Sequence, residues 1–259
     1  MVENLHVHLI QASLTWENPT QNRNRLQELV SKHVKHTDLI VLPEMFSTGF
    51  SMNTANAETF HTGTLSWMQD MAAHYDALVT GSLMFREKDD SIRNRFFWVS
   101  PLGVQGFYDK RHLFRMAGEH KHFKQGSTQE WFVWRGWNIM PQVCYDLRFP
   151  VFSRNTGQTD LYLYVANWPA LRRDAWKTLL LARAIENQAY VAGVNIVGRD
   201  GNGIDYSGDT LAADPLGNLV TSASNREAVL HFEADMELLK ATRKKLPFLN
   251  DRDDFSISL

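Results

Sequence analysis

The chain has 259 residues, of which 44% are hydrophobic and 22% are charged, and its formal net charge is −2 at pH 7. This composition can bury a substantial core and gives no reason to expect nucleic acid or an anionic membrane as a partner. A single cysteine excludes an internal disulfide. No signal peptide is apparent, and no apolar run approaches the roughly 20 residues of a membrane span. We therefore expect a cytoplasmic protein.

The first half of the chain alternates short apolar runs with amphipathic stretches. The runs are typical of buried strands, and the stretches place apolar residues three or four positions apart, as helices do. In chain order they predict a strand at residues 5–12, a helix at 22–34, a strand at 38–42, a helix at 64–75, and strands at 78–85, 93–100 and 104–108.

The second half continues the pattern. It predicts strands at 129–135 and 137–143, a helix at 146–155, a strand at 161–166, a helix at 175–187, a strand at 190–197, a glycine-rich loop at 201–208, two or three strands up to Phe232, and a helix capped by Asp235. No linker or repeat divides the chain, so one domain over residues 1–259 is expected. Alternating helices and strands with paired strands inside predict a layered α/β domain with helices outside.

Three short runs place reactive side chains at the ends of predicted strands. They are Leu-Pro-Glu-Met-Phe at 42–46, Tyr-Asp-Lys-Arg-His-Leu-Phe at 108–114, and Val-Cys-Tyr-Asp-Leu-Arg-Phe-Pro at 143–150. Reactive groups in α/β domains gather beyond the carboxyl ends of strands, so Glu44, Lys110 and Cys144 are expected to meet. A carboxylate, an ammonium and a thiol are the groups needed to cleave a C–N bond by acyl transfer.

Each of these side chains also has a plainer interpretation. Cys144 could be the nucleophile, its pKa lowered by the start of the following helix, or an inert buried thiol. Glu44 could move the thiol proton or be a solvated loop residue. Lys110 could hold an oxyanion together with the backbone N–H of Tyr145, or be a solvated residue at a strand end.

Taken together, the three runs resemble the Glu-Lys-Cys motifs of the nitrilase superfamily of carbon–nitrogen hydrolases, in the same order and spacing. The resemblance spans nearly the whole chain. It is most similar to the ω-amidase (2-oxoglutaramate amidase) branch, through residues 42–50, 108–123 and 183–187. It implies a four-layer α-β-β-α sandwich of the nitrilase type, no metal or organic cofactor, and a homodimer. The helices after the cysteine would pack across its two-fold axis, with the tail from about residue 247 at the interface.

The resemblance also assigns supporting residues. The family has a second glutamate that helps to hold the substrate and the lysine, and Glu119 matches it; the alternative is a surface ion pair with a nearby lysine. Trp168 follows a strand end and is expected to wall the pocket. Arg115 and Arg148 are placed with Trp168 in the predicted substrate site. The residues alone do not choose among the arginines that could pair with a substrate carboxylate, namely Arg115, Arg148, Arg172 and Arg173.

The function implied is an amidase acting on 2-oxo dicarboxylic acid monoamides, such as 2-oxoglutaramate and 2-oxosuccinamate, through a cysteine thioester. The alternatives are a deaminated-glutathione amidase, a nitrilase, a carbamoylase, or a catalytically silent dimeric binding protein. Two histidine pairs have the spacing of metal ligands but lack a clear third ligand. His6 and His8 are interpreted as a solvent face, and His120 and His122 as part of an active-site loop.

Overall fold

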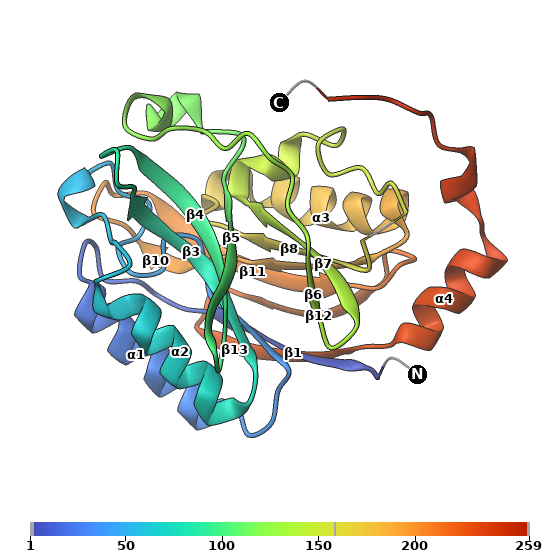
Figure 1. Cartoon of the computed structure of the whole chain (residues 1–259), viewed down its shortest axis with the longest axis horizontal. Coiled ribbons are helices and arrows are strands. Elements are labelled where there is room, and N and C mark those ends of the chain that lie inside the picture. Colours follow the sequence, from blue (N-terminus) through green and yellow to red (C-terminus); the bar gives the residue numbers. More distant parts are fainter. Residues whose placement is uncertain (1–2, 158, 258–259) are drawn as a thin grey trace.

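The computed structural model describes residues 3–157 and 159–257. Within them, two β-sheets pack face to face and helices cover the outer faces (Figure 1). Helices α1 (Pro19–His33) and α2 (Gly63–Tyr75) cover the first sheet, and α3 (Arg173–Asn187) covers the second. The predicted α-β-β-α sandwich is confirmed.

The first sheet brings the ends of two distant strands to one edge. Its order is β13-β1-β2-β3-β4-β5. Strands β1, β2 and β3 run parallel, while β4 is antiparallel to both β3 and β5. Strand β5 therefore points the same way as β2, and the chain leaves both at the same edge. The strands are β1 (Leu5–Gln11), β2 (Leu39–Val41), β3 (Leu78–Arg86), β4 (Ile92–Ser100), β5 (Gly103–Asp109) and β13 (Ala228–Ala234).

The second sheet likewise brings the ends of two strands from the second half of the chain to one edge. Its order is β10-β11-β9-β8-β7-β6, with β12 paired to β11. Strands β7, β8 and β9 run parallel, so the ends of β7 and β8 share an edge. The strands are β6 (Phe132–Trp134), β7 (Trp137–Val143), β8 (Leu161–Val165), β9 (Tyr190–Val194), β10 (Val197–Arg199), β11 (Asp205–Ala213) and β12 (Leu219–Ser224).

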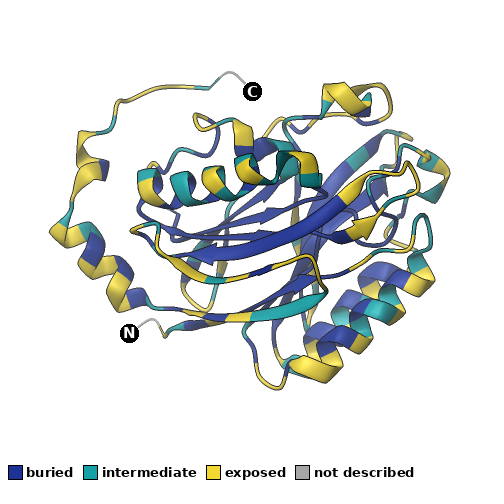
Figure 2. Ribbon diagram, turned by 180° about the vertical axis from the view of Figure 1, so that it is seen from behind, coloured by how far each residue is buried: buried dark blue, intermediate teal, exposed yellow. Residues whose placement is uncertain are grey.

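The core between the sheets follows from the two-residue period of the strands. Leu5, Val7 and Leu9 point into it from β1, whereas Ile10 points to the other face, beneath α1 and α2. Figure 2 shows strands that are largely buried and helices that are buried along the side facing a sheet. Each sheet supplies one wall of this core. The packing of the core therefore fixes how the strand ends of the two sheets face each other.

The structure moves some predicted boundaries. Helix α1 begins at Pro19, not at residue 22, because the Asn18 side chain accepts a hydrogen bond from the Gln21 N–H at 3.0 Å. Proline suits the first helical position, where its missing N–H is not needed. The predicted strand at 190–197 is two strands, β9 and β10. The predicted loop at 201–208 is partly β11, which begins at Asp205.

The predicted helix at 146–155 is wrong. A five-residue 3-10 helix, η4 (Cys144–Arg148), stands at this place, and irregular turns follow it. Pro150 explains the early end, because proline lacks an N–H donor and disfavours a helical conformation in the residue before it.

The last helix, α4 (Met236–Lys245), is capped as predicted. The Asp235 carboxylate accepts hydrogen bonds from the N–H groups of Glu237 and Leu238 at 2.8 and 3.0 Å. A short 3-10 helix follows at Phe248–Asp251, and the chain then runs along the outside of the body (Figure 1). Among the described residues, no helix is long and apolar enough to cross a membrane.

The solvent face predicted for His6 and His8 is correct only for His6. His8 is 7% exposed, its Nδ1 lies 3.0 Å from Thr37 Oγ1, and its ring centre lies 4.8 Å from that of His231. Burial, and then the neighbouring His231 and His6, lower the pKa of His8 to about 4.

This shift predicts a loss of stability in mild acid. Between the ordinary pKa of 6.5 and the folded value of about 4, the unfolded chain binds more protons at His8 than the folded chain does. Folding stability should therefore fall by about 3 kcal/mol as the pH drops through that window. Urea denaturation at pH 7 and at pH 4.5 should show a steeper loss for wild type than for His8→Gln. Equal losses in the two proteins would contradict the prediction.

Candidate active site

Glu44, Lys110 and Cys144 lie together where the edges of the two sheets meet. Glu44 follows β2, Lys110 follows β5, and Cys144 follows β7. Lys110 Nζ lies 2.9 Å from Glu44 Oε1, and both side chains are fully buried. Cys144 lies close enough to Glu44 and Lys110 for the charges of both to act on its thiol. The solvated alternatives for Glu44 and Lys110 are therefore wrong.

Glu119 completes this buried group. It is fully buried, and both of its carboxylate oxygens lie 3.0 Å from Lys110 Nζ. Its Oε2 also accepts a hydrogen bond from the Phe114 N–H at 2.5 Å. A surface ion pair for Glu119 is thus excluded, and the side chain lies where the family resemblance places it.

The two carboxylates keep Lys110 charged. Burial by itself would lower the pKa of Lys110, but the negative charges of Glu119 and Glu44 outweigh burial and raise it above the ordinary value. Burial raises the pKa of Glu119, and the charge of Glu44 adds to this, although Lys110 opposes both. The single positive charge of Lys110 therefore lies between two buried carboxylates.

The surroundings of Cys144 favour the protonated form of its thiol. Burial, followed by the charge of Glu44, raises the pKa of the thiol well above its ordinary value, and Lys110 offsets only part of this. The expectation of a lowered thiol pKa is wrong, because η4 is one short 3-10 turn and two carboxylates lie nearby. A base must therefore remove the proton before the sulfur can attack.

The backbone is strained at both reactive corners. Cys144 has φ +48°, and Met45, directly after Glu44, has φ +44°. Non-glycine residues in this left-handed region cost roughly 1–3 kcal/mol each and persist only where the surroundings impose them. At Cys144 the strain allows the chain to turn sharply from β7 into η4.

The buried carboxylate of Asp146 imposes that corner. It accepts hydrogen bonds from the Val143 N–H at 3.0 Å and from the Tyr108 hydroxyl at 2.9 Å. It also binds the N–H of His112 at 2.9 Å and the ring Nδ1 of His112 at 2.8 Å. Tyr108 and His112 flank Lys110 in the chain. The Asp146 side chain therefore links the turn at Cys144 to the segment that carries Lys110.

Two asparagines contact Glu44 that reasoning from the sequence missed. Asn94 Nδ2 in β4 lies 2.8 Å from Glu44 Oε1. Asn167, after β8, donates its backbone N–H to Glu44 Oε2 at 2.7 Å and its side-chain amide to the Glu44 carbonyl at 2.6 Å. Neither contact has a local signal in the sequence: Asn94 stands between Arg93 and Arg95, and Asn167, although it follows an apolar strand run, lies 123 positions from Glu44.

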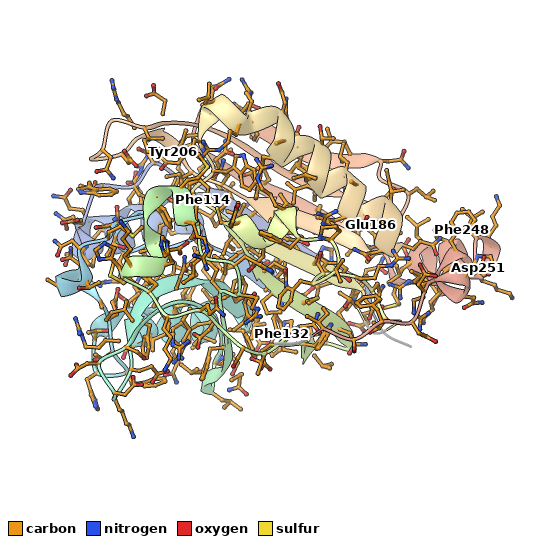
Figure 3. All side chains as sticks on the ribbon, turned by 90° about the horizontal axis from the view of Figure 1, so that it is seen from above. Phe114, Phe132, Glu186, Tyr206, Phe248 and Asp251 are labelled. Carbon is orange, nitrogen blue, oxygen red and sulfur yellow. The ribbon has the colours of Figure 1, made fainter. Side chains whose placement is uncertain are left out.

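A small pocket opens onto Cys144, with an enclosed volume of about 60 Å³. Its walls are mostly apolar, with several aromatic side chains, and come from both halves of the chain. Phe114 and Tyr206, labelled in Figure 3, lie on the same side of the molecule and both line it. Trp168 lines the pocket as expected, and the others include Phe50, Tyr145 and Asn167.

The pocket distinguishes among the candidate arginines. Arg148 and Arg172 line it. Arg115 lies in a neighbouring surface hollow, and Arg173 is held by Asp209, with Nη2 and Oδ1 2.6 Å apart. The prediction of Arg115 as a pocket residue therefore fails, and Arg172 takes its place.

Aromatic rings, not acids, hold the two pocket arginines. The guanidinium carbon of Arg148 lies 4.9 Å from the centre of the Trp168 ring, and that of Arg172 lies 5.3 Å from the Phe114 ring. Among residues 3–157 and 159–257, neither guanidinium has a carboxylate within ion-pair distance. Both charges remain free to bind an anion.

The histidine pair of the predicted active-site loop, His120 and His122, is exposed. Across the described part of the chain, no group of three histidine, cysteine, aspartate or glutamate residues is arranged to hold a metal ion.

Residues 6–244 match the carbon-nitrogen hydrolase family. The chain belongs to the carbon–nitrogen hydrolases.

Relatives of this carbon–nitrogen hydrolase align along its whole length. Omega-amidase YafV from Yersinia enterocolitica is 47% identical over 252 residues, covering 97% of this chain and 98% of the relative. A 2-oxoglutaramate amidase from Bacillus subtilis is 29% identical over 250 residues, covering 95% and 96%. The crystal structure of XC1258 from Xanthomonas campestris, a CN-hydrolase superfamily protein with an arsenic adduct in its active site, is 41% identical. It superposes with a TM-score of 0.96 over 98% of this chain and 99% of that one.

The prediction that Glu44 acts as the base of this carbon–nitrogen hydrolase can be tested by removing its carboxylate. Glu44→Gln keeps the shape of the side chain but cannot take a proton from the neutral thiol, so kcat/KM should fall by about 10²–10⁴. Alkylation of Cys144 by iodoacetamide should slow as well. Lys110→Met should cost a similar factor, and the double variant should not multiply the two losses, because both residues serve one relay.

Glu237→Gln is a matched control, because it changes an exposed glutamate of α4 that pairs only with Lys240. It should keep both rates. A Glu44→Gln enzyme within tenfold of wild type would remove Glu44 from the role of base.

Proposed function

We propose that this carbon–nitrogen hydrolase is an ω-amidase. It would hydrolyse the terminal amide of 2-oxo dicarboxylic acid monoamides, such as 2-oxoglutaramate and 2-oxosuccinamate, to the 2-oxo diacid and ammonia. Identity of 46–47% with Omega-amidase YafV over nearly the full chain supports this activity. The observation in the structure that carries the proposal is the pocket, where two arginines without acidic partners among the described residues lie beside the partly buried Cys144.

The pocket suits a short anionic amide. The amide carbon must come within about 3–3.5 Å of the Cys144 sulfur to be attacked. In a monoamide of a four- or five-carbon diacid, the carboxylate then lies a few bonds away, within reach of Arg148 or Arg172. A guanidinium can bind a carboxylate through two parallel hydrogen bonds, and its flat face can remain stacked on an aromatic ring. A pocket of about 60 Å³ suits a short substrate better than a long, peptide-like one.

The same charges disfavour glutamine. Glutamine has the length of 2-oxoglutaramate but carries an ammonium where the oxo acid has a neutral ketone. In this pocket the ammonium would face Arg148, Arg172 and Lys110. The carboxylates that act on the Cys144 thiol, Glu44 and Glu119, are already engaged with Lys110. Burying an unpaired charge of this kind costs several kcal/mol.

The first half of the reaction forms a thioester. Glu44 takes the thiol proton as the Cys144 sulfur bonds to the amide carbon, and the C=O electron pair moves onto oxygen. Lys110 and the backbone N–H of Tyr145 stabilise this oxyanion. The oxyanion then reforms the carbonyl, the C–N bond breaks, and Glu44 gives its proton to the nitrogen, which leaves as ammonia. Glu119 holds Lys110 in place throughout.

The second half releases the acid. Glu44 takes a proton from water as the water oxygen bonds to the thioester carbon, and Lys110 again stabilises the oxyanion. Collapse of this intermediate breaks the C–S bond, and the departing Cys144 sulfur recovers a proton from Glu44. The net reaction consumes one amide and one water and yields one acid and one ammonia, with the enzyme unchanged.

We also infer that residues 1–259 work as a single hydrolase domain, since one continuous core takes side chains from both sheets. A reducing compartment such as the cytoplasm suits an enzyme whose nucleophile is a free thiol.

A homodimer would cover exposed apolar side chains of the segment that follows the nucleophile and of the C-terminal tail. Val151 is 58% exposed and Phe255 is 45% exposed, and both line a hollow between the segment after Arg148 and the C-terminal tail. Exposed apolar side chains gathered in this way are typical of an association surface. We expect sedimentation velocity at micromolar concentration to give a dimer that Val151→Asp weakens. A wild-type monomer would contradict the proposal.

Substrate selectivity tests the proposed activity directly. Ammonia release should be measured over 2-oxoglutaramate, 2-oxosuccinamate, glutamine, asparagine, a simple nitrile and an N-carbamoyl amino acid. We expect 2-oxoglutaramate to exceed glutamine by at least about 10² in kcat/KM, because glutamine leaves its ammonium unpaired. Protein quenched during turnover should carry an acyl group on the peptide containing Cys144, and Cys144→Ala should have no activity. A nitrile or a carbamoyl compound as the best substrate would refute the ω-amidase assignment.

The same assay identifies the carboxylate-binding arginine. Losing a charge-assisted hydrogen bond costs about 1.5–3 kcal/mol, so Arg148→Met or Arg172→Met should raise KM for 2-oxoglutaramate by roughly 10- to 100-fold. Arg115→Met, outside the pocket, is the control and should leave KM unchanged. Unchanged KM in both pocket variants would show that the substrate carboxylate binds elsewhere.

A further inference from the structure

We propose that Asn94 is a positioning residue that decides which oxygen of Glu44 receives the thiol proton. Glu44 Oε1 accepts hydrogen bonds from Lys110 Nζ at 2.9 Å and from Asn94 Nδ2 at 2.8 Å. Two donors occupy both lone pairs of that oxygen and leave no place for a proton. The inference rests on the roles proposed above for Glu44 and Cys144.

The other oxygen, Oε2, remains available. It accepts the Asn167 backbone N–H at 2.7 Å, which occupies one lone pair. The Asn167 side-chain amide lies 3.5 Å from Oε2 and makes its short bond, 2.6 Å, to the Glu44 carbonyl. The second lone pair of Oε2 can therefore take the proton from Cys144 and return it. With Asn94 in place, only Oε2 can receive the thiol proton. Without Asn94, Oε1 would have a free lone pair and could receive the proton as well.

The orientation of the Asn94 amide is set by the loop that carries Glu44. Asn94 Oδ1 accepts a hydrogen bond from the Ser82 hydroxyl at 2.8 Å, and Ser82 Oγ accepts one from the Met45 N–H at 2.9 Å. A flipped amide would turn its oxygen toward Glu44 and its NH₂ group toward Ser82, so the observed orientation is strongly favoured. Met45 directly follows Glu44, so the hydrogen bonds form a closed path from Glu44 through Asn94 and Ser82 back to the backbone beside Glu44.

Asn94 also bridges the two carboxylates. Its Nδ2 lies 3.3 Å from Glu119 Oε1, in addition to its bond to Glu44. Lys110 supplies the only positive charge between the two acids. A neutral amide that donates to both eases their repulsion and adds no group that titrates. An aspartate here would have nearly the same shape but would place a third carboxylate beside the other two.

The test compares Asn94→Asp, Asn94→Ala and Ser82→Ala with wild type. Losing an oriented donor in an active site costs about 10²–10³ in kcat, so we expect at least about a 100-fold fall in kcat for Asn94→Asp. Its KM should stay within about threefold, because Asn94 does not line the pocket. The pH dependence of Cys144 alkylation by iodoacetamide should move upward by about one unit or more, because a third carboxylate opposes formation of the thiolate. Ser82→Ala should also lower kcat and move the pH dependence of alkylation upward, by smaller amounts than Asn94→Asp.

Asn187→Asp is the matched control. Asn187 is fully buried and its Oδ1 accepts the Asn155 N–H, far along the chain from the reactive residues. It should lower stability and leave kcat and the alkylation profile unchanged. If Asn94→Asp does not fold, Ser82→Ala still tests the proposal.

Two results would overturn it: kcat and alkylation profiles like wild type in every folded variant, or a loss confined to thermal stability, as in the control. Alkylation needs no substrate, so this test holds even if the ω-amidase assignment fails.

Discussion

The buried ammonium of Lys110 is the interaction on which the rest of the site depends. A lone charge in this position would cost many kcal/mol, and it is tolerated because two carboxylates, Glu44 and Glu119, lie within 3.0 Å of it. The pairing also acts on Glu119, because Lys110 opposes the rise in pKa that burial causes there. The fold must therefore bring three charged groups together in one buried place. Because β2 and β5 run in the same direction, Glu44 and Lys110 follow strand ends at the same edge of the sheet.

The charge balance also sets the state of the nucleophile. With one ammonium between two carboxylates, the field at Cys144 does not favour a thiolate, and burial disfavours it further. The enzyme would thus hold a neutral thiol beside its base and separate charge only as the sulfur attacks. This arrangement demands accurate geometry. The strained backbone at Cys144, the four hydrogen bonds to Asp146 and the contacts of Asn94 and Asn167 with Glu44 all serve to supply it.

Chemistry and substrate choice reside on different parts of the structure. The reacting groups follow strand ends, whereas much of the pocket wall comes from connecting segments, including those that bear Phe114 and Trp168. Arg148 and Arg172 lie on aromatic rings of these walls, free of acidic partners. Substitutions in the walls could therefore change the substrate without disturbing the buried charges.

The sequence by itself determined the elements with strong local patterns and the three residues in distinctive motifs. Strand β7 was predicted to the residue, and Glu44, Lys110, Cys144 and Glu119 lie together as expected. Tertiary structure decided what depends on distant contacts. Asn94 meets a carboxylate 50 positions away and Asn167 one 123 positions away, so neither could be recognised from its neighbours. The direction of the thiol pKa shift and the choice of Arg172 over Arg115 likewise required the packed site, because charge and burial depend on which groups fold together and not on their order in the chain.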